Sequence, residues 1–159
     1  MEYSLFSRDA EEQGQIGACK ELGMAMMAYA VLGRGMLSAE VPEVEEMTAD
    51  DIRVRLPRFH SANVEKNLRL RSALDAIARR KNATLAQLSI AWPMARGSRA
   101  AASIVPIPGA KSRGHLEENV RAAEIVFTTD DLAEIDRIVP PGVAAGTRYP
   151  IGQMRRVNL

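Results

Sequence analysis

The hydrophobic residues of this chain of 159 residues follow two patterns, short continuous runs and a longer helical repeat. The short runs indicate three candidate strands. Apolar and β-branched runs at residues 1–6, 24–30 and 103–107 have the length of strands. The run from Met24 to Ala30 is continuous, which predicts a strand that is buried on both faces.

The longer period, which is typical of helices, fills the stretches between and after these runs. Residues 9–22 are acidic at the start and stop at Gly23, which predicts one helix with a glycine cap. A second helical pattern begins at Val64 and is expected to end at Asn82. Two more helices are predicted near the C-terminus, the last opened by Thr128 or Thr129, with the apolar stripes Leu116, Val120 and Ala123, then Leu132, Ile135 and Ile138.

A capping box predicts a further helix that contains a proline. Thr84 and the glutamine three residues later, Gln87, form the box, and the helix extends through Trp92 toward Gly97. Pro93 removes a backbone hydrogen bond inside it, at a cost of about 3 kcal/mol. Either the helix kinks at Trp92 or it tolerates this loss.

The alternation of strands and helices predicts an α/β fold with parallel strands. Three strands make a small sheet with two open edges, so the chain has the pattern of part of a larger fold. Residues 36–62 show no steady period and are expected to form a long loop, which either covers a site or is disordered. Residues 140–159 form a tail that is rich in proline and glycine at its start.

Composition narrows the class of protein. Apolar residues make up 47% and charged residues 26%, which is typical of one soluble globular domain. The net charge of +1 gives no global attraction to nucleic acid or to an anionic membrane. Cys19 is the single cysteine, which excludes an internal disulfide and fits a reducing compartment. No apolar run is long enough to span a membrane and no targeting leader is evident, so we expect a cytoplasmic protein.

The most informative stretch is SIVPIPGAKSRGHLEEN, residues 103–119. A strand stops at Pro108 and Gly109, the cations Lys111 and Arg113 follow, and a helical pattern then begins. Free N–H groups and partial positive charge at a helix start suit a phosphate. The alternative is an ordinary connection between strand and helix that binds nothing.

Four motifs in order resemble the C-terminal half of the aldo-keto reductases, a family of (β/α)8 barrels that use NADPH. EYSLFSRDAEE (residues 2–12) resembles the sixth strand and its helix, and AYAVLGRG (28–35) resembles the seventh strand and cofactor loop. TLAQLSIAW (84–92) resembles the helix before strand eight, and VPIPGAKSRGHLEEN (105–119) resembles strand eight and the adenosine-phosphate loop. The branch with plant alkaloid and auxin-induced reductases and their bacterial relatives is the most similar.

The resemblance implies a partial TIM (β/α)8 barrel over residues 1–159. It would hold about the last three βα units, the C-terminal helices and the tail, with residues 36–62 as a long loop on the substrate side. In such barrels the phosphate often lies on the loops after strands seven and eight. Arg34 is therefore expected on the same side of the fold as Lys111 and Arg113. A Rossmann fingerprint is not implied, because Ser38 stands where a third glycine would be required.

The resemblance also implies an NADP(H) site. Tyr29 would stack on the nicotinamide, or else be a core aromatic at a strand end, and residues 32–35 would wrap the pyrophosphate through backbone N–H groups. Lys111 and Arg113 would contact the 2′-phosphate and favour NADPH over NADH. The implied cofactor-binding residues are Tyr29, Ala30, Leu32, Gly33, Arg34, Gly35, Ile107, Gly109, Ala110, Lys111, Ser112, Arg113, Glu118 and Asn119.

Glu118 and His115 each have two possible interpretations. Glu118 and Asn119 would hold the adenine edge, although Glu118 is equally well a solvated helix acid. His115 stands where some family members carry a phosphate-binding arginine, and we expect it to be solvated surface.

No catalytic residue is implied within this chain. The family's tyrosine, lysine, aspartate and histidine lie in the first five strands, and neither Tyr3 nor Lys20 matches their motifs. Ala30 and Val31 also replace a serine and a proline of the usual cofactor loop. We therefore expect no carbonyl reduction by the chain alone, and a small carbonyl substrate only if an N-terminal half is supplied. Alternatives are a non-catalytic nucleotide-binding or interaction module and a degenerate remnant, with marginal stability and self-association through open strand edges.

Overall fold

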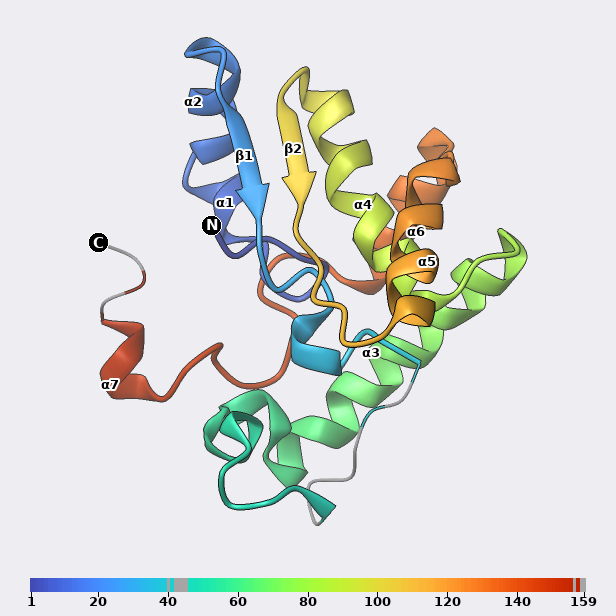
Figure 1. Ribbon diagram of the computed structural model, residues 1–159. Coiled ribbons are helices and arrows are strands. Elements are labelled where there is room, and N and C mark those ends of the chain that lie inside the picture. The colour runs from blue at the N-terminus through green and yellow to red at the C-terminus, as the bar shows by residue number, and fades with distance from the viewer. Residues whose placement is uncertain (40, 42–45, 156, 158–159) are drawn as a thin grey trace.

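The structure is a computed structural model that describes residues 1–39, 41, 46–155 and 157 (Figure 1). Parts of the expected loop at 36–62, including the acidic residues at 43 and 45, and the last residues of the tail lie outside these ranges. The helices and strands are α1 (Asp9–Glu12), α2 (Gln15–Glu21), β1 (Ala25–Ala28), α3 (Ser61–Arg80), α4 (Leu85–Ala100), β2 (Ser103–Pro106), α5 (Arg113–Arg121), α6 (Thr129–Ile138) and α7 (Ile151–Met154).

A two-stranded parallel sheet forms the centre of the fold. Ala25 of β1 lies opposite Ser103 of β2, and the register continues to the ends of both strands. The expected strand at residues 1–6 is reduced to one parallel bridge between Glu2 and Tyr29. It goes no further because the backbone turns back at residues 4–7, where Ser4 and Ser7 exchange N–H···O bonds of 3.0 and 3.1 Å.

Helices cover one face of this sheet and leave the other face open. In Figure 1, α1 and α2 lie beside β1 while α4 lies beside β2. On the open face Met27 is 57% exposed and Val105 is 45% exposed. The prediction that residues 24–30 are buried on both faces is therefore wrong, because no element of the described residues packs on the second face.

Trp92 of α4 anchors the core between the sheet and the helices. Its side chain is fully buried and its ring centroid lies 5.1 Å from that of Tyr3. The guanidinium carbons of Arg8 and Arg96 lie over the same ring at 5.1 and 5.8 Å. The following residue, Pro93, is buried within α4, and the helix continues beyond it to Ala100. The helix thus tolerates the lost backbone bond, and it also passes its expected end near Gly97.

Two of the predicted helices differ in detail from the structure. Gly14, with φ of 73°, divides the expected helix at residues 9–22 into α1 and α2. A left-handed residue cannot continue a right-handed helix, and glycine adopts that conformation without steric cost. In α5 the apolar stripe faces outward, since Leu116 is 56% and Val120 is 66% exposed. The buried contact of α5 is made by Asn119 instead.

Two helix starts follow the sequence closely, whereas α3 begins at Ser61, three residues before the predicted start at Val64. Thr84 accepts a hydrogen bond from the Gln87 N–H, and the Gln87 side chain accepts one from the Thr84 N–H, as the capping box predicts. Thr128 caps α6 in the same way with Asp131. Within the described ranges, no helix has the length and apolar character needed to cross a bilayer.

Replacing Asn67 with alanine is expected to lower the free energy of unfolding by about 1–3 kcal/mol, because buried backbone groups would lose their partners. The buried Asn67 amide donates to Arg58 O at 3.1 Å and Ala145 O at 3.0 Å, and accepts from Ala145 N at 2.8 Å. Urea denaturation followed by circular dichroism measures the change. Lys66→Ala, at an exposed neighbour on α3, is the matched control. Equal midpoints for the two variants would contradict this role.

Candidate cofactor site

The carboxyl ends of β1 and β2 open onto one cavity of about 890 Å³. Four segments contribute to its wall: the loop after β1, the loop after β2 with α5, the stretch near residue 52, and the start of α4. The lining residues are Ala30, Val31, Leu32, Arg34, Gly35, Ser38, Ala39, Asp51, Ile52, Arg53, Ala86, Ile107, Pro108, Gly109, Ala110, Lys111, His115, Glu118 and Asn119.

The loop after β1 has an unusual backbone. Gly33, Arg34 and Gly35 have φ values of 57°, 59° and 99°, and Ala30 has a φ of 56°. Gly33 N–H donates to Ala30 O at 2.8 Å and Gly35 N–H donates to Leu32 O at 3.0 Å, so the loop is tightly wound. Successive N–H groups in left-handed and turn conformations make concave anion-binding surfaces.

The loop after β2 brings a cation to the opposite wall. Lys111 lines the cavity, and Ser112 caps the nine-residue helix α5 by accepting from His115 N–H at 3.1 Å. The Asn119 side chain donates to Gly109 O at 3.4 Å and so connects α5 back to this loop. The wall therefore combines a full positive charge with the positive end of a helix.

A second cation comes from the 3-10 helix η3 (Ile52–Arg55). Nε and Nη2 of Arg53 donate to the Asp51 carboxylate at 2.9 and 2.5 Å. These bonds, with that from Arg53 N–H, lower the pKa of Asp51 to about 2. A Cβ on Gly35 would lie 3.4 Å from Nη1 of Arg53, so this guanidinium lies directly over the glycine loop.

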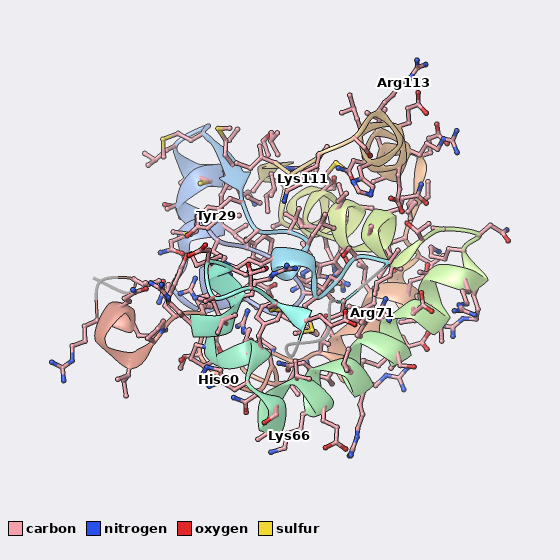
Figure 2. All side chains as sticks on the ribbon, turned by 60° about the horizontal axis from the view of Figure 1, so that its bottom comes forward. Tyr29, His60, Lys66, Arg71, Lys111 and Arg113 are labelled. Atoms are coloured by element: carbon pink, nitrogen blue, oxygen red, sulfur yellow. The ribbon has the colours of Figure 1, made fainter. Side chains whose placement is uncertain are left out.

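Arg71 of α3 holds the part of the cavity wall that residues 38 and 39 form. Nη2 of Arg71 donates to Ser38 O and to Ala39 O, both at 2.8 Å. Residues 38 and 39 of the loop after β1, which line the cavity, are therefore held in place from α3. Figure 2 shows Arg71 pointing inward from α3, whereas Lys66 projects from the outer surface of the same helix.

Ten of the fourteen residues implied by the resemblance line this cavity, and Arg34 and Lys111 lie on its walls as expected. The other four, Tyr29, Gly33, Ser112 and Arg113, do not line it. Arg113 is 91% exposed and bonds to Glu117 at 2.7 Å, and Figure 2 shows it projecting from the rim. In this structure the Arg113 side chain is not placed to make its predicted contact with a 2′-phosphate.

Tyr29 lies at the end of β1, outside the cavity. Burial and then its hydrogen bond with Tyr149 raise the pKa of Tyr29 to about 12. The ring remains partly exposed on the open face of the sheet. Its predicted nicotinamide contact would therefore be made beyond the cavity.

The sequence reasoning missed several lining residues, and Arg53 is the most important of these. The signal was present, because two aspartates precede Ile52 and Arg53 in a stretch without helical period. An aspartate that caps a short helix commonly bonds to a residue two positions on. His115, which we expected to be solvated surface, also lines the cavity while remaining exposed.

Neither Tyr3 nor Lys20 lines the cavity. Tyr3 is buried and its hydroxyl donates to Glu11 at 2.7 Å, and burial followed by the charge of Glu11 raises the pKa of Tyr3. Lys20 is exposed on α2. The described chain also contains no group of three or more His, Cys, Asp or Glu side chains that could hold a metal ion.

Glu2 accepts a hydrogen bond from Arg34 of the glycine loop, and its ionisation makes the stability of the fold depend on pH. Burial raises the pKa of Glu2, but the bonds and charge of Arg34 outweigh this, so the net pKa is lowered. A lowered folded pKa means that the ionised carboxylate stabilises the fold above the unfolded pKa, and that this stability is lost as pH falls through the folded pKa.

We expect the stability difference between the wild type and Glu2→Gln to shrink as the pH falls from about 6 to about 3, because protonated Glu2 resembles glutamine. Denaturant midpoints measured across this range for both proteins give the difference directly. Other carboxylates titrate equally in both proteins and cancel. A difference that stays constant with pH would show that Glu2 is not ionised in the fold.

The family model for the aldo/keto reductase family matches residues 1–140. This chain belongs to the aldo/keto reductase family. The chain is 36% identical over 154 residues to the aldo-keto reductase yakc of Schizosaccharomyces pombe, whose name includes NADP(+), and this alignment covers 96% of the chain. It is 35% identical over 149 residues to a probable aldo-keto reductase 1 of Glycine max, with 94% of the chain covered.

The chain spans less than half the length of these aldo/keto reductase relatives, 44% of the yeast protein and 41% of the soybean protein. Solved structures agree on the fold. An aldo-keto reductase from Klebsiella pneumoniae in complex with NADPH matches with a TM-score of 0.62 and 24% identity, over 95% of this chain and 42% of that one. A glycerol dehydrogenase from Gluconobacter oxydans matches with a TM-score of 0.73 and 20% identity, over 86% and 40%. The described α/β unit thus has the fold of part of an aldo-keto reductase.

Proposed function

We propose that this chain is the NADP(H)-binding part of an aldo-keto reductase, formed by about the last three βα units of a barrel. One observation carries the proposal. The glycine loop after β1, Lys111 after β2 and Arg53 of η3 converge on one cavity at the carboxyl ends of the two strands. Ligands of parallel α/β folds bind at this end of the strands.

The residues of the cavity fit the adenosine end of the cofactor. A volume of about 890 Å³ lies within the range of ligand sites in proteins. Lys111 would hold the 2′-phosphate and residues 32–35 the pyrophosphate, with Arg53 above them. Glu118 and Asn119 also line the cavity and would hold the adenine edge. The yeast relative is named for NADP(+), and the Klebsiella structure contains NADPH, which supports this choice.

Bound NADPH would supply the hydride for reduction of a small aldehyde or ketone, but this chain would supply only cofactor binding. Its Tyr3 hydroxyl is engaged by Glu11 and held protonated by burial, and Lys20 is remote on an exposed helix surface. We therefore propose that the chain alone does not reduce carbonyl compounds. Turnover would require the catalytic side chains of an N-terminal half, in a cytoplasmic setting that fits the single cysteine.

Titration of the purified chain with NADPH and NADH, each followed by nucleotide fluorescence, tests this function. We expect saturable NADPH binding that is about tenfold or more tighter than NADH binding, because one charge-assisted contact is worth about 1.5–3 kcal/mol. We also expect no aldehyde-dependent loss of NADPH absorbance. Failure to bind NADPH, or steady turnover by the pure chain, would overturn the proposal.

A second candidate is a non-catalytic interaction module, and the uncovered surface of the fold favours it. Val105 on β2, Ile107 just after this strand and Leu116 on α5 are exposed large apolar side chains. Exposed apolar strands and open edges promote association. Sedimentation at increasing concentration separates the two candidates. Nucleotide binding by a monomer favours the first, and association without nucleotide binding, abolished by Val105→Lys, favours the second.

A further inference from the structure

Arg34 occupies a backbone conformation that a side chain makes costly. Its φ of 59° and ψ of 34° lie in the left-handed region, between Gly33 and Gly35, which have positive φ as well. Residues other than glycine rarely adopt this region, because the Cβ crowds the following carbonyl. Glycine would serve better here if only the backbone mattered, so the arginine side chain must contribute something that offsets the strain.

The side chain of Arg34 joins two distant parts of the chain. Nη1 and Nη2 donate to the two carboxylate oxygens of Glu2 at 3.2 and 2.9 Å. Nη2 also donates to the Tyr149 hydroxyl at 2.7 Å, and the guanidinium carbon lies 4.9 Å from the centroid of that ring. We name these three residues the Glu2–Arg34–Tyr149 cluster. It connects the loop after β1 to the first residues and to the C-terminal tail.

Glu2 is a fixed anchor within this cluster. Its side chain is only 1% exposed, and it accepts a further bond from Ser7 Oγ at 2.9 Å. Ser7 Oγ in turn accepts from Nη1 of Arg58 at 2.8 Å, and Nη2 of Arg58 donates to Phe6 O at 2.6 Å. A buried carboxylate with several fixed donors cannot move without leaving charge unpaired, so it holds Arg34 in one position.

The side-chain contacts of the cluster lie outside the cavity, whereas the backbone of the glycine loop lies on the cavity wall. Neither Glu2 nor Tyr149 lines the cavity, whereas Arg34 and its neighbours Leu32 and Gly35 do. Within the described residues, no backbone carbonyl accepts from the N–H groups of Leu32 or Arg34, which leaves both available to an anion. The charge of the guanidinium, in contrast, is already neutralised by Glu2.

We infer that Arg34 is a positioning residue for nucleotide binding, which acts by holding the N–H groups of Leu32 and Arg34 toward the cavity through the Glu2–Arg34–Tyr149 cluster. This inference rests on the proposed function. It assigns Arg34 a role different from that of Lys111, which forms no ion pair within the described residues and interacts with the Asp51 charge only at longer range. Arg34 would support the pyrophosphate that NADP(H) and NAD(H) share, while Lys111 would read the 2′-phosphate that only NADP(H) carries.

The first test compares NADP⁺ and NAD⁺ affinities of variants by titration calorimetry. Arg34→Ala is expected to weaken both by the same factor of about ten, the worth of a charge-assisted bond, so that their ratio is unchanged. Lys111→Ala, as the matched control, is expected to change the ratio. Glu2→Gln and Tyr149→Phe remove single contacts of the cluster and should show the Arg34→Ala pattern more weakly.

Arg34→Gly separates positioning from mere structural strain. It relieves the left-handed conformation, so its unfolding midpoint should equal or exceed that of Arg34→Ala. Its affinity for both nucleotides should nevertheless stay low, because the cluster is lost. Wild-type affinity in Arg34→Gly, or a changed NADP⁺ to NAD⁺ ratio in either variant, would overturn the inference.

A second readout needs no nucleotide, and so distinguishes failure of the inference from failure of the proposed function. Hydrogen–deuterium exchange of residues 32–37 should accelerate about tenfold in Arg34→Gly and remain unchanged in Lys111→Ala. If the wild type binds no nucleotide, the proposed function fails while this exchange still measures the cluster. Unchanged exchange in Arg34→Gly, and in Glu2→Gln as a second variant, would refute the cluster itself.

Discussion

Truncation of Trp92 to alanine is expected to lower the free energy of unfolding by about 3–5 kcal/mol, which for a domain of this size leaves little folded protein. The ring is fully buried in α4, contacts the Tyr3 ring, and lies under the guanidinium groups of Arg8 and Arg96. Its removal would open a cavity between the helices and the first residues of the chain, and would leave two cations without their aromatic contact.

Guanidinium chloride denaturation followed by far-ultraviolet circular dichroism measures this loss. Trp92→Phe is the matched control, because it keeps an aromatic ring for Tyr3 and the two arginines, and it should cost clearly less than the alanine variant. Equal midpoints for the wild type and Trp92→Ala would show that the core is not organised around this helix.

Replacing Lys111 with alanine is expected to weaken NADPH binding about 10- to 100-fold, while NADH binding changes little. Lys111 lines the cavity beside the start of α5. The two nucleotides differ only in this phosphate, so a loss confined to NADPH identifies the group that lysine contacts. Lys111→Arg should retain the preference for NADPH.

Arg113→Ala is the control that tests whether the structure or the sequence motif better identifies the phosphate-binding residue. The motif gives Arg113 the same role as Lys111, but in the structure its guanidinium is almost fully exposed and paired with Glu117. We therefore expect Arg113→Ala to change NADPH affinity much less than Lys111→Ala does. A larger loss in Arg113→Ala would mean that the loop after β2 rearranges when the nucleotide binds.

Signals that act within one or two turns of chain could be predicted from the sequence. The capping box at Thr84 fixed one helix start, Thr128 is one of the two residues expected to open α6, and Asn82 follows the end of α3 with a φ of 54°. Each depends on a side chain bonding to a backbone a few residues away, so no tertiary information is needed. The parallel pairing of β1 and β2 followed from the helices between them.

Features that depend on neighbouring layers could not be predicted in this way. An apolar strand is buried on both faces only if a layer covers each face, and here Met27 and Val105 remain exposed. The stripe on α5 has the same origin, since its outward position follows from what packs against the helix. The division at Gly14 was missed because a glycine inside an acidic helical pattern is compatible with a continuous helix.

The candidate site shows the same difference between features that are local in sequence and features that depend on distant residues. A strand followed by a glycine turn and cations indicated the loop after β2 from contiguous residues, and the family resemblance implied ten of the lining residues. Arg53 lies eighteen residues beyond Gly35 and is brought over it only by the course of the loop. The partners of Arg34 are still farther away, at Glu2 and Tyr149, and no local pattern connects them.

Amide chemical-shift mapping of the isotope-labelled chain during NADPH titration tests most directly whether one cavity seats the dinucleotide. We expect the largest changes at residues 32–35 and 107–111, with smaller ones at residues 51–53 and none on α2. Shifts confined to residues outside these three segments, or no shifts at saturating nucleotide, would contradict the account.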